Sequence, residues 1–166
     1  GTVENPFVIF PETAQIYAKR EAELKAIMAV KKQEKAAWEK ANPELAAKMK
    51  QFFSGKLPKI DWDAIQQKSN QATRVASANV LSTLAENVEN MIVSSADLCN
   101  SDKTDGFLKK TSAITKNNFK GQFLQSGVSE LTMACICIGM HLHGGITTAC
   151  GTFFVFSDYM KPAIRM

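Results

Sequence analysis

Residues 121–157 carry one formal charge, that of Glu130, when the two histidines are taken as neutral. A stretch so poor in charge is typical of a domain core or of a membrane span. Two histidines and the pair Gly144-Gly145 interrupt it, so we expect a domain core and no membrane span. With 166 residues, of which 22% are charged, the chain is typical of one globular domain with an additional arm.

Strand-like and helix-like segments alternate after residue 61. This alternation predicts an α/β domain with a parallel sheet flanked by helices. The expected strands are 90–94, 123–125 and 146–152, and the expected helices are 72–88, 129–143 and a further one from residue 156. A polar loop is expected over 95–105. The chain stops within an amphipathic pattern that has no C-cap, so we expect it to be part of a longer protein.

Residues 1–60 are predicted to form a helical arm and linker, with helices over 13–40 and 44–53. They contain 11 Lys and Arg against 7 Glu, whereas the remaining residues contain 9 cations and 9 anions. Such a basic arm could bind nucleic acid or an acidic membrane. A solvated helix with ion pairs such as Glu21–Lys25 explains it better. A non-catalytic interaction or nucleic-acid-binding module is kept as the alternative function.

Glu130 allows two interpretations. It could lie in the first turn of a helix with Ser129 as N-cap, where the macrodipole favours a negative charge. Its apolar surroundings also favour a protonated carboxyl, which could share a proton with a ligand nitrogen. The residues alone leave both interpretations open.

Phe153, Phe156 and Tyr159 recur every third residue and are expected to share one helix face. Such a stripe usually belongs to the core, but it could also form a slot for a flat heterocycle.

Arg74 lies near a predicted helix start, where a cation opposes the macrodipole. We therefore expect Arg74 to have a carboxylate or phosphate partner.

The cysteines give little indication of a metal site. Cys135, Cys137, His141 and His143 match no zinc spacing, and Cys135 and Cys137 cannot share a helix face. We expect buried thiols and no metal ligands. Four cysteines without a secretory signal indicate the reducing cytoplasm. The chain has no Ser-His-Asp pattern, P-loop or Rossmann glycine fingerprint.

Five motifs together resemble the transketolase family of thiamine-diphosphate enzymes. They are Ala72-Thr73-Arg74, Ser94-Ser95-Ala96-Asp97-Leu98, Gly127-Val128-Ser129-Glu130-Leu131-Thr132-Met133, Leu142-His143-Gly144-Gly145 and Gly151-Thr152-Phe153-Phe154-Val155-Phe156-Ser157-Asp158-Tyr159. The resemblance implies that 1–60 end an N-terminal domain and its linker, and that 61–166 begin the pyrimidine-binding domain, a partial thiamine-diphosphate-binding fold. The sequence departs from the family pattern at Ser129, Leu131 and the pair Thr148-Ala149. These departures bear on the shape of the pocket and on which sugar the enzyme prefers.

The resemblance also implies individual roles. Glu130 would be the catalytic glutamate, which hydrogen-bonds the aminopyrimidine ring nitrogen of thiamine diphosphate and promotes its imino tautomer. An aromatic pocket around the pyrimidine ring would consist of Phe153, Phe156 and Tyr159. Two further cofactor contacts, at the subunit boundary, would be Asp97 and Leu98. The phosphate of the sugar substrate would be held by Arg74 and Ser101.

The implied reaction is transfer of a two-carbon ketol unit from a ketose phosphate to an aldose phosphate by a homodimer. A deoxyxylulose-phosphate synthase or a two-carbon dehydrogenase subunit is a weaker match. The family's Gly-Asp-Gly motif for Mg²⁺ and diphosphate does not occur in the sequence. The Mg²⁺ ligands are therefore expected in the N-terminal domain, and the isolated chain is expected to lack turnover. A poorly folded product of a truncated reading frame is a third possibility.

Overall fold

The computed structural model describes residues 2–166, which divide into two units between Lys48 and Met49. The first unit is dominated by α1 (Pro11–Ala41), which starts at a proline because that residue has no N–H to leave unpaired in the first turn. None of the described residues of α1 is buried. Its charged side chains pair along the helix. The predicted pair is one of them, with Lys25 Nζ 2.6 Å from Glu21 Oε1. Helix α2 (Pro43–Phe53) follows.

A three-stranded parallel sheet forms the centre of the second unit, which confirms the α/β prediction. It contains β1 (Met91–Ser95), β2 (Phe123–Gln125) and β3 (Thr147–Gly151) in the order β2-β1-β3. Val93 of β1 lies opposite both Phe123 and Ala149. The expected strands differ from the observed ones by at most one residue at either end.

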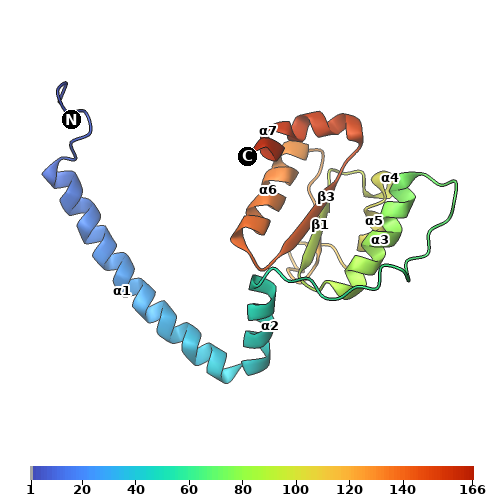
Figure 1. Ribbon diagram of the computed structural model, residues 1–166, viewed down its shortest axis with the longest axis horizontal. Coiled ribbons are helices and arrows are strands. Elements are labelled where there is room, and N and C mark those ends of the chain that lie inside the picture. The colour runs from blue at the N-terminus through green and yellow to red at the C-terminus, as the bar shows by residue number, and fades with distance from the viewer. Residues whose placement is uncertain (1) are drawn as a thin grey trace. The chain divides into compact units, whose positions relative to one another are not determined.

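Helices cover both faces of this sheet (Figure 1). Helix α3 (Thr73–Asn87) lies on one side with the short α5 (Asp105–Leu108), and α6 (Glu130–His143) lies on the other. The apolar core contains Leu81, Val93, Phe107 and Phe123, with Ala149 packed against it. The neighbouring sheet positions Ser94 and Cys150 therefore face the opposite side, because side chains alternate along a strand.

The segment predicted as a polar loop over 95–105 contains a helical turn, α4 (Cys99–Asp102). That prediction was wrong because the polar side chains make local hydrogen bonds that stabilise a turn. The Asp102 carboxylate accepts hydrogen bonds from Ser95 Oγ at 2.7 Å and from both the backbone N–H and Oγ1 of Thr104, each at 2.8 Å.

The last helix also differs from the expectation. Residues Phe154–Met160 form the 3₁₀-helix η1, and α7 (Lys161–Arg165) follows it. Pro162 has no backbone N–H to donate to an earlier carbonyl, so one continuous α-helix from residue 156 is disfavoured. No helix within residues 2–166 is long and apolar enough to cross a membrane.

Gly144 and Gly145 end α6 with φ angles of +85° and +77°, a region that side chains with a Cβ rarely adopt. The ring of Phe53 packs against this turn, and a Cβ at Gly145 would lie 3.0 Å from it. Both the backbone conformation and the close contact therefore require glycine at position 145.

Candidate functional site

A cavity of about 430 Å³ lies where the three parallel strands end. Each strand is followed by a segment that lines it: Ala96, Asp97 and Leu98 after β1, Val128 and Glu130 after β2, and Phe156 and Tyr159 after β3. In open parallel sheets, ligands bind outside the carboxyl ends of the strands. The topology thus brings together five of the eight predicted site residues, namely Asp97, Leu98, Glu130, Phe156 and Tyr159.

Glu130 is the buried acidic residue of this cavity, and its carboxyl oxygens open into it. The residue is 8% exposed, and no described residue hydrogen-bonds or ion-pairs with its side chain. As the first residue of α6 it lies at the positive end of the macrodipole. A carboxyl that opens into a largely apolar cavity has little water around it, which strengthens a hydrogen bond to a ligand there. Glu130 is therefore positioned to exchange a hydrogen bond with a polar group in the cavity.

Ser129 occupies the N-cap position of α6, as predicted, but its side chain does not cap the helix. Its hydroxyl donates to the carbonyl of Ser126 at 2.6 Å. The hydroxyl oxygens of Ser126 and Ser94 are in turn 2.7 Å apart. The Ser94 hydroxyl donates to the carbonyl of Leu124. These contacts attach the loop before Glu130 to the sheet. The expected capping interaction was wrong, because the hydroxyl instead donates to the loop carbonyl of Ser126.

The aromatic stripe forms as predicted, on the 3₁₀-helix η1 and the residue before it. The ring centroids of Phe153 and Phe156 are 6.1 Å apart with planes at 12°, and those of Phe156 and Tyr159 are 6.3 Å apart with planes at 26°. A 3₁₀-helix has three residues per turn, so side chains at every third position align. The Phe156 and Tyr159 rings give the cavity an aromatic wall, whereas Phe153 lines a neighbouring cavity.

The loop that carries Asp97 and Leu98 is held by buried polar contacts. Ser95 Oγ accepts a hydrogen bond from the backbone N–H of Leu98 at 3.2 Å and donates to Asp102. Asp97 has a φ of +62°, which is unusual for a residue with a side chain and is typical of positions constrained by their surroundings. Sequence reasoning missed Ser95 and Asp102 as the residues that fix this loop. Their signal was the density of capping side chains after a buried strand.

A second cavity, of about 500 Å³, lies between α3 and the segment after β3. Arg74, Asp102, Thr152 and Phe153 are among the residues that line it. Arg74 is exposed, and the described residues include no ion-pair partner for it. The hydroxyl oxygen of Thr152 is buried without a hydrogen bond. This cavity therefore offers a free cation and an unsatisfied polar atom to a ligand.

Ser101 is not brought into either cavity. It lies in α4, where its hydroxyl donates to the side-chain oxygen of Asn100 at 3.3 Å. Sequence reasoning did not predict two residues that line the first cavity, Ala96 and Val128. They are apolar residues in loops, and nothing in their pattern distinguishes them from ordinary loop positions.

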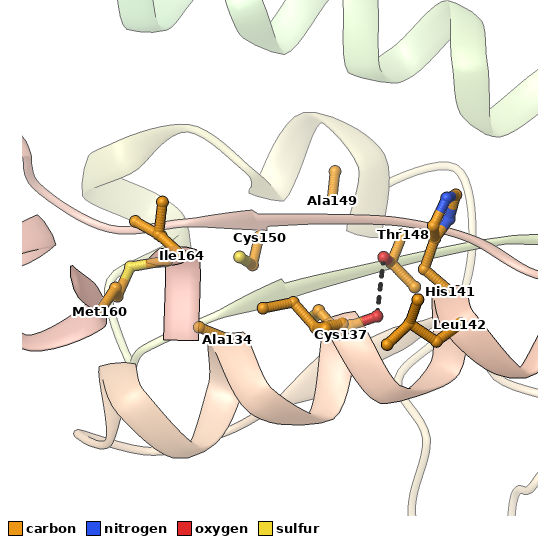
Figure 2. A pocket seen from close by; sticks show the side chains of 10 residues that line it. Ala134, Cys137, His141, Leu142, Thr148, Ala149, Cys150, Met160 and Ile164 are labelled. Atoms are coloured by element: carbon orange, nitrogen blue, oxygen red, sulfur yellow. Dashed lines mark hydrogen bonds between the residues drawn. The ribbon is translucent and has the colours of Figure 1, made fainter. Parts of the chain in front are cut away.

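The cysteine and histidine residues singled out in the sequence all lie on α6. Within residues 2–166 there is no group of three or more potential metal ligands of the His, Cys, Asp or Glu type. Cys137 is buried, as expected, but Cys135 is exposed. Cys137, His141 and Cys150 line a third cavity, of about 360 Å³, between α6 and β3 (Figure 2). A hydrogen bond from the Cys137 thiol lowers the pKa of Cys150 to about 7, and the same contact and burial raise the pKa of Cys137.

Comparison with known proteins gives one family. The model of the transketolase pyrimidine binding domain matches residues 69–166. The transketolase of Geobacillus stearothermophilus is 41% identical over 135 residues, which cover 79% of this chain and 20% of the relative. The transketolase of Halalkalibacterium halodurans is 35% identical over 174 residues, covering 99% of this chain and 25% of the relative. This chain thus spans a fifth to a quarter of the length of these relatives.

Solved structures agree with the sequence comparison. The transketolase of Leishmania mexicana superposes with a TM-score of 0.80 at 26% identity, over 95% of this chain and 24% of that one. The transketolase of Pichia stipitis in complex with sedoheptulose-7-phosphate gives a TM-score of 0.80 at 29% identity, over 98% of this chain and 25% of that one. The chain therefore belongs to the transketolase pyrimidine-binding domain family.

Proposed function

We propose that this chain supplies the aminopyrimidine-binding half of the active site of a thiamine-diphosphate-dependent transketolase. The observation that carries the proposal is Glu130, a buried residue whose carboxyl has no partner among the described residues and opens into a cavity with stacked aromatic rings. The complete enzyme would move a two-carbon ketol unit from a ketose phosphate to an aldose phosphate. Its family membership supports this activity.

The residues that line the cavity suit the aminopyrimidine ring of the cofactor in their chemistry. The rings of Phe156 and Tyr159 offer a flat apolar surface to a heterocycle. The Glu130 carboxyl would hold a proton at a ring nitrogen, and its burial keeps water from competing for that hydrogen bond. Leu98 and Val128 add apolar walls. When bound, the cofactor supplies the electron sink that ketol transfer requires.

The diphosphate and Mg²⁺ would be held elsewhere. Residues 2–166 contain no cluster of three potential metal ligands. We propose that the ligands of Mg²⁺ lie in an N-terminal domain outside the described residues and that the active site is completed in a homodimer. Asp97 and Leu98 would lie near the boundary between the two subunits. It follows that the 166-residue chain alone should not turn over substrate.

The second cavity is the proposed place for the phosphate of the sugar substrate. Arg74 has a free guanidinium there, which can bind phosphate with two parallel hydrogen bonds. Ser101 is retained as a second phosphate contact, although it lines neither cavity. One transketolase structure similar to this chain is described as a complex with sedoheptulose-7-phosphate, which supports sugar phosphates as the substrate class.

The family domain is proposed to begin near residue 61, with 1–60 as the preceding arm and linker. The matched family segment starts at residue 69, and the chain before it includes the exposed turn around Gly55. The reducing cytoplasm is the compartment that we propose, because the four cysteines of this chain are free thiols.

The test is a coupled assay of the complete polypeptide that contains this sequence. A panel of ketose phosphate donors and aldose phosphate acceptors is supplied with and without thiamine diphosphate and Mg²⁺. We expect ketol transfer that depends on both additions. Loss of turnover with Arg74→Ala at low substrate, recovered at high substrate, would support the phosphate role. Absence of ketol transfer across the whole panel would overturn the proposed function.

A further inference from the structure

The cavity between α6 and β3 is lined by two of the four cysteines (Figure 2). We propose that Cys137 and Cys150 form a peroxide-sensitive dithiol that closes to a disulfide between α6 and β3. This modification site lies outside the cavity of Glu130 and does not depend on the proposed function.

The fold places the two thiols between the same helix and strand. Thr148 and Cys150 lie on the face of β3 turned toward α6, whereas Ala149 points to the opposite side (Figure 2). The hydroxyl of Thr148 donates to the carbonyl of Cys137 at 3.1 Å, which joins β3 to α6 at the level of this cysteine. Cys137 belongs to the buried stripe of α6, with Met133 and Ala134.

Both side chains line one cavity and are close enough for the Cys137 thiol to act as a hydrogen-bond donor toward Cys150. That contact lowers the pKa of Cys150 to about 7, against an ordinary value of 9.0, although burial acts in the opposite direction. A substantial fraction of Cys150 is therefore thiolate at neutral pH, and the thiolate is the reactive form.

The surroundings suit a small neutral oxidant. The cavity of about 360 Å³ is far larger than the space that a water-sized molecule needs, and Leu142, Met160 and Ile164 make it mainly apolar. His141 on α6 also lines it. On the other side of β3, Arg74 of α3 and Asp102 of α4 line the cavity that Cys150 shares with them. Cys150 is half-buried, so hydrogen peroxide can reach its sulfur.

The chemistry balances with peroxide as the oxidant. The Cys150 thiolate attacks one oxygen of hydrogen peroxide and breaks the O–O bond, which gives a sulfenic acid and releases hydroxide. The Cys137 sulfur then attacks the sulfenic sulfur, and the hydroxyl group leaves with the Cys137 proton as water. The two thiols are oxidised by two electrons in total, and one peroxide is reduced to two waters.

The other cysteines are matched controls. Cys135 lies on the same helix two residues away, but it is exposed on another face. Cys99 packs against the core on the α3 side of the sheet. Neither lines the cavity that Cys137 and Cys150 share, so neither should form an intramolecular disulfide.

The experiment treats the reduced chain with hydrogen peroxide and measures intact mass and non-reducing peptide maps. We expect the loss of two hydrogen atoms and a peptide that links Cys137 to Cys150. Cys99→Ser and Cys135→Ser should form the link as fast as the unmodified chain. Cys137→Ser and Cys150→Ser should not form it, and far-ultraviolet circular dichroism would establish that each is folded.

Two results would overturn the proposal. One is a link that involves Cys99 or Cys135 in the unmodified chain. The other is peroxide consumption that leaves Cys137 and Cys150 unlinked under conditions that oxidise exposed Cys135. Both results can be read in the unmodified chain, so the inference stays testable even if a variant at buried Cys137 does not fold.

Discussion

The rings of Phe156 and Tyr159 stack with centroids 6.3 Å apart, and both line the cavity that also contains the Glu130 carboxyl. Phe153 continues the stack on the other side of Phe156, although it lines the neighbouring cavity. The aromatic stripe thus connects the proposed pyrimidine site with the proposed phosphate site. Phe156 is the central ring, so its removal should affect the cofactor more than any other single change in the stripe.

Phe156→Ala in the complete enzyme should raise the concentration of thiamine diphosphate needed for half-maximal activity by about tenfold. This corresponds to roughly 1.4 kcal/mol, within the range of one aromatic stacking contact. Phe154→Ala is the matched control, because Phe154 is 94% exposed and stacks on none of these rings. Equal effects of the two variants on cofactor titrations would contradict the assignment of the aromatic wall.

Two helical glycines provide a test of the packing. A Cβ at Gly106 of α5 would lie 2.6 Å from the carbonyl oxygen of Ala78, whereas a Cβ at Gly139 of α6 would meet nothing within 4 Å. Gly106→Ala should lower the free energy of unfolding by about 1–3 kcal/mol through overpacking. Gly139→Ala should raise it by about 0.5–1 kcal/mol, because alanine favours the helix. Urea denaturation of the chain measures both, and a gain in stability from Gly106→Ala would contradict the close approach of α3 and α5.

Alkylation of Cys150 should follow pH with a midpoint near its pKa of about 7. Below this pH the thiol is protonated and slow, and above it the thiolate reacts faster, until the rate levels off. Cys137→Ala removes the hydrogen bond that lowers the pKa, so the midpoint should move toward the ordinary thiol value of 9.0. Cys137→Ser keeps a hydroxyl donor and should shift it less. Iodoacetamide labelling followed by peptide mass spectrometry gives each profile, and identical profiles for the unmodified chain and Cys137→Ala would rule out the contact.

The basic arm is expected not to bind nucleic acid. In α1 the Lys31 ammonium is 2.9 Å from Glu34 and Lys35 is 3.9 Å from Glu39, so these cations are paired along the helix. Binding of the chain to duplex and single-stranded oligonucleotides should remain undetectable even at low salt. Salt-dependent binding that disappears when Lys31, Lys32 and Lys35 are neutralised would instead support the alternative function.

The sequence predicted the parallel α/β fold because the period of apolar residues changes from segment to segment, and each period corresponds to one type of element. It could not predict α4, since the hydrogen bonds of Asp102 to Ser95 and Thr104 depend on how the chain folds after β1. It also did not predict η1, because the spacing of three in the aromatic stripe is compatible with both an α-helix and a 3₁₀-helix.

For the site, the motif carrying Glu130 predicted a carboxyl that the structure places in the cavity, and the spacing of three predicted the aromatic stack. The sequence did not reveal that Phe153 lines a different cavity from Phe156, or that Ser101 lies outside both. These facts depend on how the segments after β1 and β3 approach one another in space. The sequence did not reveal that Cys137 and Cys150 lie close together, for the same reason. Their closeness depends on how β3, which pairs with β1, packs against α6.

The most direct test of the account is the turnover of the complete enzyme with Glu130→Gln. Glutamine keeps the size of the side chain but cannot hold or transfer the carboxyl proton, so ketol transfer should fall by at least about a hundredfold, the lower range for loss of a general acid–base group. Glu86→Gln is the control, because Glu86 pairs with Lys110 at 2.7 Å on the surface and should retain full activity. A Glu130→Gln enzyme that keeps most of its turnover would contradict the central claim.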